Sequence, residues 1–274
     1  MRRFKQVDAF ADRPFRGNPV AVVLEADGLE TAEMQHIARW TNLSETTFLL
    51  ASKVADYRLR IFTPSEELPF AGHPTIGSAH AALQAGLAKA AGGRLRQECG
   101  AGVLDLVVED GVIFVRSPPV KLTPLANIAS KVGIPLAPQA HLLRADVGPV
   151  WLVGEMTDAA ALAALKPDMT ALAEWTASLN ATGITVFAAS GERDCIVHVR
   201  SFAPAQGIAE DPVCGSGNIC VAAYLRHFER APGSYVARQG MQLGRDGRVH
   251  LRTDARDIWL GGRAVTCVEG SLNA

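Results

Sequence analysis

The sequence has few aromatic residues and no excess of charge of either sign. Aromatic side chains make up 6% of its 274 residues, and 27 basic residues are balanced by 28 acidic ones. A nucleic-acid-binding protein usually carries a basic patch, so binding to nucleic acid is not expected. The length suits two modest domains or one large one, with enough core to fold unaided.

Paired cysteines and long apolar segments are also missing. The odd set of five cysteines argues against a disulfide framework and favours a reducing compartment. No apolar stretch approaches the roughly 20 residues that span a bilayer, and the start "MRRFKQVDAFADRPF" lacks the apolar region of a signal peptide. We therefore expect a cytoplasmic globular protein without a membrane partner. Four cysteines are expected to be core or strand filler, because nothing acidic, basic or metal-like groups with them in sequence: Cys99, Cys195, Cys220 and Cys267.

Sequence motifs for nucleotides and metals are absent or incomplete. No P-loop, nucleophile elbow or HExxH occurs. The run "GSGNIC" (215–220) nearly matches a dinucleotide fingerprint but ends in Cys220 and does not follow an evident strand. His73 and His80 lie seven residues apart without a zinc-type ligand set around them. Neither a cofactor nor a metal is expected.

The chain repeats a pattern of strands and helices, which predicts an α/β or α+β fold. "ARWT" (38–41) recurs as "AEWT" (173–176), and "RIFTP" (60–64) recurs as "RSFAP" (200–204). Gly72 of "FAGHPTIGSAHAAL" then matches Gly215 of "VCGSGNICVAAYL". The offset between the copies grows from 135 to 140 to 143 residues, as a duplicated unit with small insertions requires.

Each half ends its repeat in a glycine turn that opens an apolar helix, roughly at 74–85 and 217–228. A helix that is apolar nearly all round is normally buried, so each half is expected to wrap a mostly antiparallel sheet around one central helix. Three prolines in "RSPPVKLTP" (116–124) interrupt the pattern. We therefore expect two pseudo-symmetric halves, residues 1–118 and 119–274.

The two glycine turns are candidates for binding an anion. Free N–H groups and the positive end of the helix dipole favour a carboxylate or phosphate at a helix N-terminus. If the halves face each other, both turns converge on one cleft. The alternative is that Gly72, Gly215 and Gly217 only permit tight turns and close packing.

Glu45 in "NLSETTFLL" is the candidate acid–base residue. Its place at the edge of an apolar segment predicts partial desolvation, which raises a carboxyl pKa towards the range useful for moving protons. The alternative is a capping or solvated edge residue. The other half has Gly183 near the corresponding position, so a single carboxylate serves any shared site.

Other polar residues near the turns each admit two interpretations. His73 either donates to a substrate oxygen or is a plain turn histidine. Asp211 orients His73, binds a substrate amine or caps the following turn. Ser216 either hydrogen-bonds the ligand or caps the helix. Cys214 precedes a helix, where the pKa of a cysteine is lowered, so it is a candidate proton carrier. Its counterpart in the first half is Ala71, which cannot carry a proton. A racemase with two thiols is therefore disfavoured, and isomerisation by one base fits better.

Four segments together resemble the PhzF-like phenazine-biosynthesis isomerases: "VDAFADRPFRGNPVAVV", "NLSETTFL", "PFAGHPTIGSAH" and "EDPVCGSGN". The resemblance covers nearly the whole chain. It implies a diaminopimelate epimerase-like fold of two halves, a cofactor-independent isomerase, and in many cases a homodimer with the site between the halves. The family reaction isomerises trans-2,3-dihydro-3-hydroxyanthranilate, with a glutamate moving a proton from C3 to C1.

The resemblance also implies roles for individual residues. Glu45 would move the proton, with His73 and Asp211 as the other catalytic residues. The glycine-rich turn would hold the substrate carboxylate, and the implied substrate-binding residues are Asn18, Gly72, Cys214, Gly215, Ser216 and Gly217.

One departure from the family pattern concerns Cys214, where phenazine-pathway members usually have threonine or another non-thiol. Cysteine there is similar to the second thiol of diaminopimelate epimerase. Two alternatives therefore stay open beside the isomerase: an amino-acid epimerase or racemase that uses Glu45 with Cys214, and a non-catalytic ligand-binding dimer. The sequence leaves the physiological substrate open.

Overall fold

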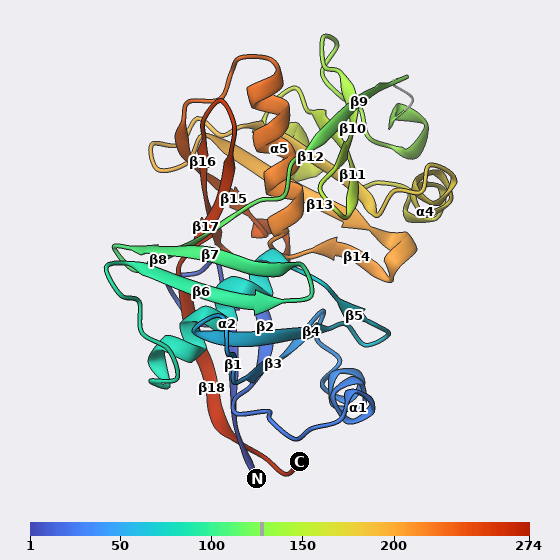
Figure 1. Ribbon diagram of the computed structural model, residues 1–274. Coiled ribbons are helices and arrows are strands. Elements are labelled where there is room, and N and C mark those ends of the chain that lie inside the picture. The colour runs from blue at the N-terminus through green and yellow to red at the C-terminus, as the bar shows by residue number, and fades with distance from the viewer. Residues whose placement is uncertain (127–128) are drawn as a thin grey trace. The chain divides into compact units, whose positions relative to one another are not determined.

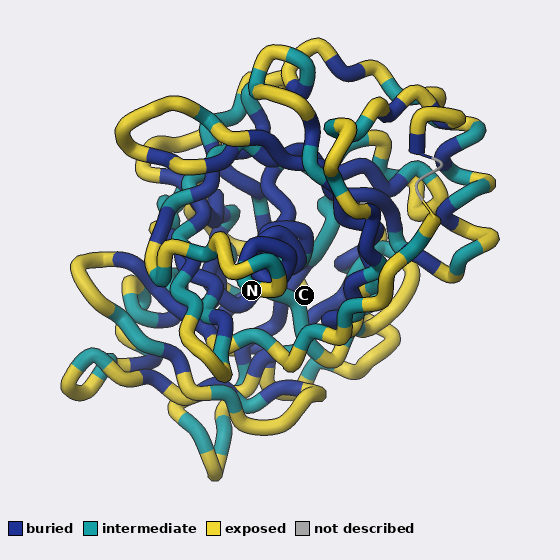
Figure 2. The backbone as a smooth tube through the Cα atoms, turned by 90° about the horizontal axis from the view of Figure 1, so that it is seen from above, coloured by how far each residue is buried: buried dark blue, intermediate teal, exposed yellow. Residues whose placement is uncertain are grey.

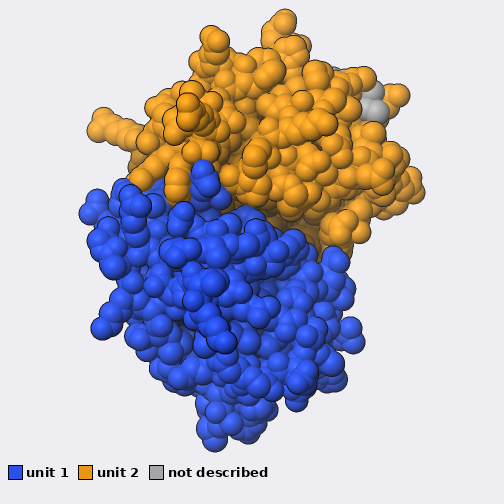
Figure 3. Space-filling view, in the orientation of Figure 1, with its two compact units in different colours: residues 1–116, 261–274 blue, residues 117–260 orange. Residues whose placement is uncertain are grey.

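The computed structural model describes residues 1–126 and 129–274, which form two compact units (Figure 3). The first unit comprises Met1–Arg116 with Gly261–Ala274, and the second comprises Ser117–Leu260. Each unit has its own set of paired strands and its own central helix (Figure 1).

The first unit contains two helices and most of its strands in its first 116 residues. Its elements are β1 (Arg2–Ala9), β2 (Asn18–Val23), α1 (Thr31–Thr41), β3 (Thr46–Leu50), β4 (Tyr57–Phe62), β5 (Glu67–Leu68), α2 (Gly72–Gln84), β6 (Arg94–Cys99), β7 (Gly102–Glu109), β8 (Val112–Arg116) and β18 (Ala264–Leu272).

The second unit repeats this succession with one extra helix and three short 3-10 turns. Its elements are β9 (Lys121–Leu125), η1 (Ala129–Val132), β10 (Leu142–Asp146), β11 (Val150–Glu155), α3 (Ala159–Ala164), α4 (Met169–Ser178), β12 (Gly183–Ala189), β13 (Val197–Ala203), η2 (Pro204–Gln206), β14 (Ile208–Asp211), α5 (Gly215–His227), β15 (Ser234–Gln239), η3 (Met241–Leu243) and β16 (Gly247–Thr253). The strand β17 (Ile258–Gly262) begins in the second unit and ends in the first.

Strand pairing confirms the duplication. In the first unit β1 pairs with β18 and β2, and the sheet continues through β3, β4, β6, β7 and β8; only the β2–β3 and β4–β6 pairs are parallel. In the second unit β10 pairs with β9 and β11, and the sheet continues through β12, β13, β15 and β16; its parallel pairs are β11–β12 and β13–β15. The parallel pairs therefore fall at the same two steps of each copy, within mostly antiparallel sheets, as expected.

The helices α2 and α5 are the buried centres of their units. Helix α2 packs against β1, β2, β3, β4, β8 and β18, and α5 packs against β10, β11, β12 and β16. Small side chains permit the approach: a methyl group added to Gly77 of α2 would lie 2.4 Å from a methyl carbon of Val20. Figure 2 shows buried helical turns in dark blue, with exposed loops in yellow around them. The expected central helices are thus confirmed.

The helix that precedes the third sheet strand ends in the same way in both copies. Asn42 caps α1 in the left-handed conformation with φ 55°, and Asn180, just after α4, has φ 49°. Asparagine tolerates this conformation better than most residues. The two asparagines correspond in the repeat, so a backbone requirement explains why both copies keep them.

The repeated Arg-x-Phe-x-Pro segment supplies an ion pair in each unit. Arg60 donates two hydrogen bonds to Glu67, of 2.7 and 2.6 Å, and Arg200 donates two to Glu210, of 2.9 and 2.8 Å. Each guanidinium also lies over the phenylalanine two residues later in its own copy. Arg200 additionally donates to backbone carbonyls at the end of α3, so the second copy of the pair connects more of its unit.

The last strand lies in the first unit, although the sequence analysis grouped residues 119–274 as one half. β18 pairs with β1 over eight residues, from Ala264 opposite Ala9 to Leu272 opposite Arg2. In the second unit, β9 takes the corresponding place beside β10.

Among the described helices, none is both long and apolar enough to span a membrane.

The duplicated ion pairs provide a matched test of burial. The side chains of Arg200 and Glu210 are 7% and 9% exposed, whereas those of Arg60 and Glu67 are 16% and 39% exposed. Removing one partner of a buried pair leaves an uncompensated charge and costs about 3–5 kcal/mol, while an exposed pair contributes about 0–1 kcal/mol. Glu210→Ala is therefore expected to lower the free energy of unfolding by about 3 kcal/mol, and Glu67→Ala by less than about 1 kcal/mol. Urea unfolding followed by circular dichroism measures both, and equal losses would contradict the prediction.

Candidate functional site

Glu45 lies in the short connection between α1 and β3. The backbone carbonyl of Glu45 accepts a hydrogen bond of 3.3 Å from the N–H of Ala21 in β2. The parallel β2–β3 pairing, with Ala21 opposite Thr46, therefore determines where this residue sits. Its side chain is only 15% exposed.

The carboxylate of Glu45 faces a histidine at the start of the buried helix. His73 is the second residue of α2, its side chain is 8% exposed, and its Nε2 lies 3.2 Å from Oε2 of Glu45. Burial raises the pKa of Glu45 from 4.5 to about 7, although a hydrogen bond from Ser44 lowers it in part. A carboxyl group with that pKa is present as both acid and base near neutral pH, which suits proton transfer.

A buried chain of hydrogen bonds supports the N-terminal turn of α2. The hydroxyl of Tyr57 donates to Oε1 of Gln97 (2.9 Å), and Nε2 of Gln97 donates to Oγ1 of Thr75 (3.2 Å). Gln97 is fully buried on β6. The sequence analysis missed this support because it depends on the parallel pairing of β4 with β6, which places Tyr57 opposite Gln97.

Asn18 begins β2 and is 1% exposed. It pairs with Ala9 of β1 and lies three residues before Ala21, whose N–H holds Glu45. Nearby, Asp8 is 2% exposed and accepts a hydrogen bond of 3.1 Å from the N–H of Gly17. Asn18 is thus placed on the strand that positions Glu45, and its role as a substrate ligand stays a prediction.

In the second unit, Cys214 is the N-cap residue of α5. Its sulfur accepts a hydrogen bond of 3.2 Å from the N–H of Gly217, and its carbonyl accepts bonds from both the N–H and the side-chain amide of Asn218. The residue is 3% exposed. The sulfur therefore takes the place that a serine or aspartate oxygen normally has at a helix N-terminus.

The expectation that the helix N-terminus lowers the pKa of Cys214 is wrong. Burial raises the pKa of this thiol well above 9.0, and the nearby charge of Asp211 raises it further. Hydrogen bonds from Ser216 and from the N–H of Gly217 oppose the shift but do not outweigh it. Cys214 is consequently a neutral thiol at pH 7.

Ser216 and Gly217 complete the turn. The hydroxyl of Ser216 accepts a hydrogen bond of 2.9 Å from the indole N–H of Trp151, a buried residue of β11. A Cβ atom on Gly217 would lie 2.5 Å from Oγ1 of Thr185 and 2.8 Å from Oγ of Ser201. Close packing therefore requires Gly217, and Trp151 is a site residue that no local sequence pattern indicated.

Asp211 ends β14 and is tied to the same turn. Its Oδ1 accepts a hydrogen bond of 3.0 Å from the N–H of Val213, and its carbonyl accepts one of 3.0 Å from Nε2 of Gln239. Oε1 of Gln239 in turn accepts a bond of 2.8 Å from Nδ2 of Asn218. Gln239 on β15 thus supports α5 much as Gln97 on β6 supports α2.

The predicted residues form one group in each unit. Glu45, Gly72 and His73 gather at the start of α2, and the second group lies at the start of α5: Asp211, Cys214, Gly215, Ser216 and Gly217. Each group joins a helix N-terminus to polar side chains, which is the chemistry of an anion site. The expectation that both groups serve one substrate stays a prediction.

Comparison with known proteins gives consistent matches over the whole chain. "Antisense-enhancing sequence 1" of Schizosaccharomyces pombe is 38% identical over 289 residues, covering 97% of this chain and 97% of that protein. Trans-2,3-dihydro-3-hydroxyanthranilate isomerase of Pseudomonas aeruginosa is 35% identical and covers 100% of this chain and 96% of that protein. The crystal structure of a Bacillus anthracis phenazine biosynthesis protein of the PhzF family has a TM-score of 0.88 at 27% identity, covering 100% of this chain and 99% of that one.

The predicted resemblance and fold are confirmed by these matches, and the prediction of an isomerase is confirmed at the level of the family. The family model described as "Phenazine biosynthesis-like protein" matches residues 7–270. The chain therefore belongs to the PhzC-PhzF family.

Proposed function

We propose that this protein moves a proton within a small carboxylate-bearing substrate, with Glu45 as the acid–base residue. The observation that supports the proposal most directly is the dehydrated carboxyl group of Glu45, whose pKa of about 7 accompanies a contact of 3.2 Å with Nε2 of His73. A base that is half ionised near neutral pH can take a proton from carbon and return it afterwards. The substrate class is similar to trans-2,3-dihydro-3-hydroxyanthranilate, on which the Pseudomonas aeruginosa relative is named to act.

The proposed step uses one carboxylate and involves no net gain or loss of protons. The Glu45 carboxylate removes a proton from one substrate carbon, and the electron pair of that C–H bond forms a new double bond to the neighbouring carbon. The π electrons of the adjacent double bond shift at the same time to the second carbon, which then takes up a proton. The carboxyl group delivers this proton to the second carbon on the same face, so no oxidant or reductant is consumed. Exchange of the carboxyl proton with solvent between the two steps carries deuterium from D₂O into the product. His73 donates to a substrate oxygen, and Asp211 is the third catalytic residue of the proposal.

The substrate carboxylate is assigned to the N-terminal turns of the central helices. The peptide N–H groups of Gly215 and Ser216, together with the positive end of the α5 dipole, favour an anion there. Gly72 offers the equivalent group on α2. A homodimeric assembly, which the family resemblance implies, stays a prediction.

An amino-acid epimerase is the second candidate, because the cysteine at position 214 is similar to the second thiol of diaminopimelate epimerase. The sulfur of Cys214 lies 3.6 Å from Oγ of Ser216 and accepts the N–H of Gly217. A thiol whose pKa lies well above 9.0 is a poor base at neutral pH. The raised pKa therefore favours the one-base isomerase, in which Cys214 serves as a helix cap.

The first prediction is that Glu45→Gln abolishes catalysed hydrogen exchange. The amide has the same shape but cannot accept a proton from carbon, so the rate should fall at least about 100-fold. Deuterium incorporation in D₂O, followed by NMR, measures the effect on dihydro-hydroxyanthranilate, its simpler cyclic analogues and several amino acids.

Glu66→Gln is the matched control, since it removes the same charge at an exposed position of the same unit and should exchange at the wild-type rate. Retention of near-normal exchange by Glu45→Gln would overturn the assignment of the base.

The second prediction concerns Cys214→Ser, which should keep at least about a third of the wild-type exchange rate. Serine is a good helix N-cap, so its oxygen can accept the N–H of Gly217 as the sulfur does. The same D₂O measurement separates the candidates. A loss of two orders of magnitude or more in this variant, with exchange at an amino-acid α-carbon, would identify the epimerase.

The third prediction is a pH-dependent stability difference that needs no substrate. An unfolded glutamate ionises near 4.5, whereas Glu45 in the folded protein ionises near 7. Between these values the unfolded state loses its proton first, so this carboxyl lowers the stability of the folded protein progressively as pH rises from about 4.5 to 7. Glu45→Gln should therefore gain stability relative to wild type across this window and show a constant difference above about pH 8. Urea unfolding at pH 5, 6, 7 and 8 measures it, and a difference that does not change with pH would show that the pKa of Glu45 is not raised.

A further inference from the structure

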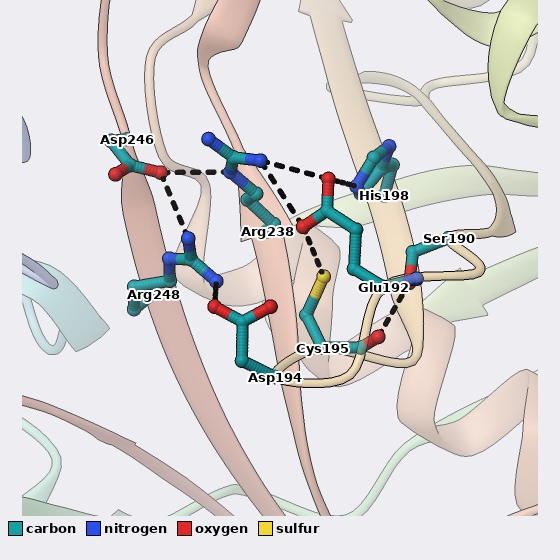
Figure 4. A network of polar contacts seen from close by, with 8 residues as sticks. All are labelled: Ser190, Glu192, Asp194, Cys195, His198, Arg238, Asp246 and Arg248. Carbon is teal, nitrogen blue, oxygen red and sulfur yellow. Dashed lines mark hydrogen bonds and ion pairs between the residues drawn. The ribbon is translucent and has the colours of Figure 1, made fainter.

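The loop at residues 190–196, between β12 and β13, brings three side chains with metal-binding atoms together (Figure 4). The N–H of Ser190 donates to the carbonyl of Ile196 (3.0 Å), and the hydroxyl of Ser190 donates to the carbonyl of Cys195. The same hydroxyl accepts the N–H of Glu192 (3.0 Å). These bonds close the loop and turn Glu192 and Cys195 towards His198 on β13.

The three ligand atoms have the spacing of a single metal site. Oε1 of Glu192 lies 3.2 Å from Nε2 of His198, and Oε2 of Glu192 lies 3.3 Å from Sγ of Cys195. All three groups lie within 4.8 Å of one another. Around a tetrahedral zinc ion, with bonds of about 2.0–2.3 Å, neighbouring ligand atoms are separated by roughly 3.4–3.6 Å. The ligand atoms of Cys195 and His198, which lie within 4.8 Å of each other, then approach by up to about 1.3 Å to bind one ion.

Burial leaves one of these atoms without a hydrogen bond. Nε2 of His198 is shielded from solvent and makes no hydrogen bond, although Glu192 is close. Cys195 is 2% exposed and the side chain of His198 is 13% exposed, while that of Glu192 is 33% exposed. A buried polar atom without a hydrogen bond is costly. A metal ion would satisfy it, and the exposed side of Glu192 provides a path for entry.

The surrounding charges do not oppose a bound cation. Figure 4 shows Arg238 and Arg248 held by Glu192, Asp194 and Asp246. The exposed Arg193 of the same loop brings these three carboxylates and the guanidinium groups into balance. Loss of the Cys195 proton to solvent on metal binding then leaves one negative charge beside the ion.

Arg238 does not exclude an ion from this cluster. Its NH1 lies 2.8 and 3.1 Å from the two oxygens of Glu192, and its Nε donates to Asp246. A carboxylate has about four lone-pair sites, so Glu192 can accept Arg238 and bind a metal with the remaining lone pairs. Such outer hydrogen bonds commonly orient metal-binding carboxylates.

We propose that Glu192, Cys195 and His198 form a zinc-binding site that pins the 190–196 loop to β13, with the fourth position open to solvent. A thiolate, an imidazole and a carboxylate together suit Zn²⁺ better than Mg²⁺ or Ca²⁺. The expectation that Cys195 is mere filler, with no metal-binding partners, is corrected by this cluster. The inference is independent of the proposed isomerase reaction, in which none of the three residues takes part.

The test is titration of the full-length, chelator-treated protein with Co²⁺ and then with Zn²⁺, followed by absorption spectroscopy. We expect one equivalent of Co²⁺ to produce the visible bands of a tetrahedral complex and a thiolate charge-transfer band, both removed by one equivalent of Zn²⁺. Cys195→Ser should lose the charge-transfer band. His198→Gln should weaken binding at least about 100-fold, since even outer partners of a metal site contribute 10–100-fold.

Cys267→Ser is the matched control, because this half-buried thiol lies in the other unit and should leave the titration unchanged. Circular dichroism of each metal-free variant verifies the fold, and His198→Gln decides the result if Cys195→Ser unfolds. Absence of stoichiometric binding by wild type, or unchanged binding in His198→Gln, would overturn the proposal. Activity is not the readout, so failure here and failure of the isomerase proposal are distinguishable.

Discussion

The burial of one helix inside each sheet is the constraint on which the rest of the structure depends. Helices α2 and α5 contact strands on several sides, so most of their side chains are buried and apolar, and they range from Gly77 to the large Tyr224. Buried backbone polar groups must still be satisfied, and the interior of each helix satisfies its own. The N–H groups of the first turn and the C=O groups of the last turn need partners from elsewhere. Polar side chains therefore collect at these N-termini, where the candidate site residues are found.

The hydrogen bonds that support these first turns are more alike in the two units than the residues that cap the helices. Gln97 and Gln239 occupy equivalent strands and each bonds a polar residue of the helix, Thr75 in one unit and Asn218 in the other. The cap residues have diverged, with Ala71 before α2 and Cys214 before α5. A duplicated frame can thus keep the same support for a helix N-terminus twice, while only one copy carries the carboxylate that we propose as the acid–base group.

The sequence was sufficient to predict the duplication and the central helices, because both depend on local patterns or on their recurrence. For Glu45 it left a desolvated carboxylate and a solvated edge residue open, and the burial of the side chain favours the first. The pKa of Cys214 was predicted in the wrong direction. Local reasoning counted the peptide N–H groups near the sulfur but had no measure of its burial or of the charge on Asp211.

Contacts between distant segments were not predictable in the same way. The bond from Trp151 to Ser216 joins β11 to α5, and the cluster around Glu192 requires the pairing of β13 with β12 and β15. Strand register decides both, and a single sequence does not specify register between strands that lie far apart in the chain.

Desolvation raises the pKa of both Glu45 and Cys214. Its chemical consequence differs because a carboxyl group and a thiol have different pKa values in water. It raises the pKa of the carboxyl group from 4.5 to about 7, into the range where a group can both accept and release a proton at neutral pH. It raises the pKa of the thiol above 9.0, further away from that range. One physical effect thus makes one group of the pair suited to proton transfer and the other unsuited to it. This asymmetry supports a reaction in which a single carboxylate takes and returns the proton, with Cys214 as the cap of its helix.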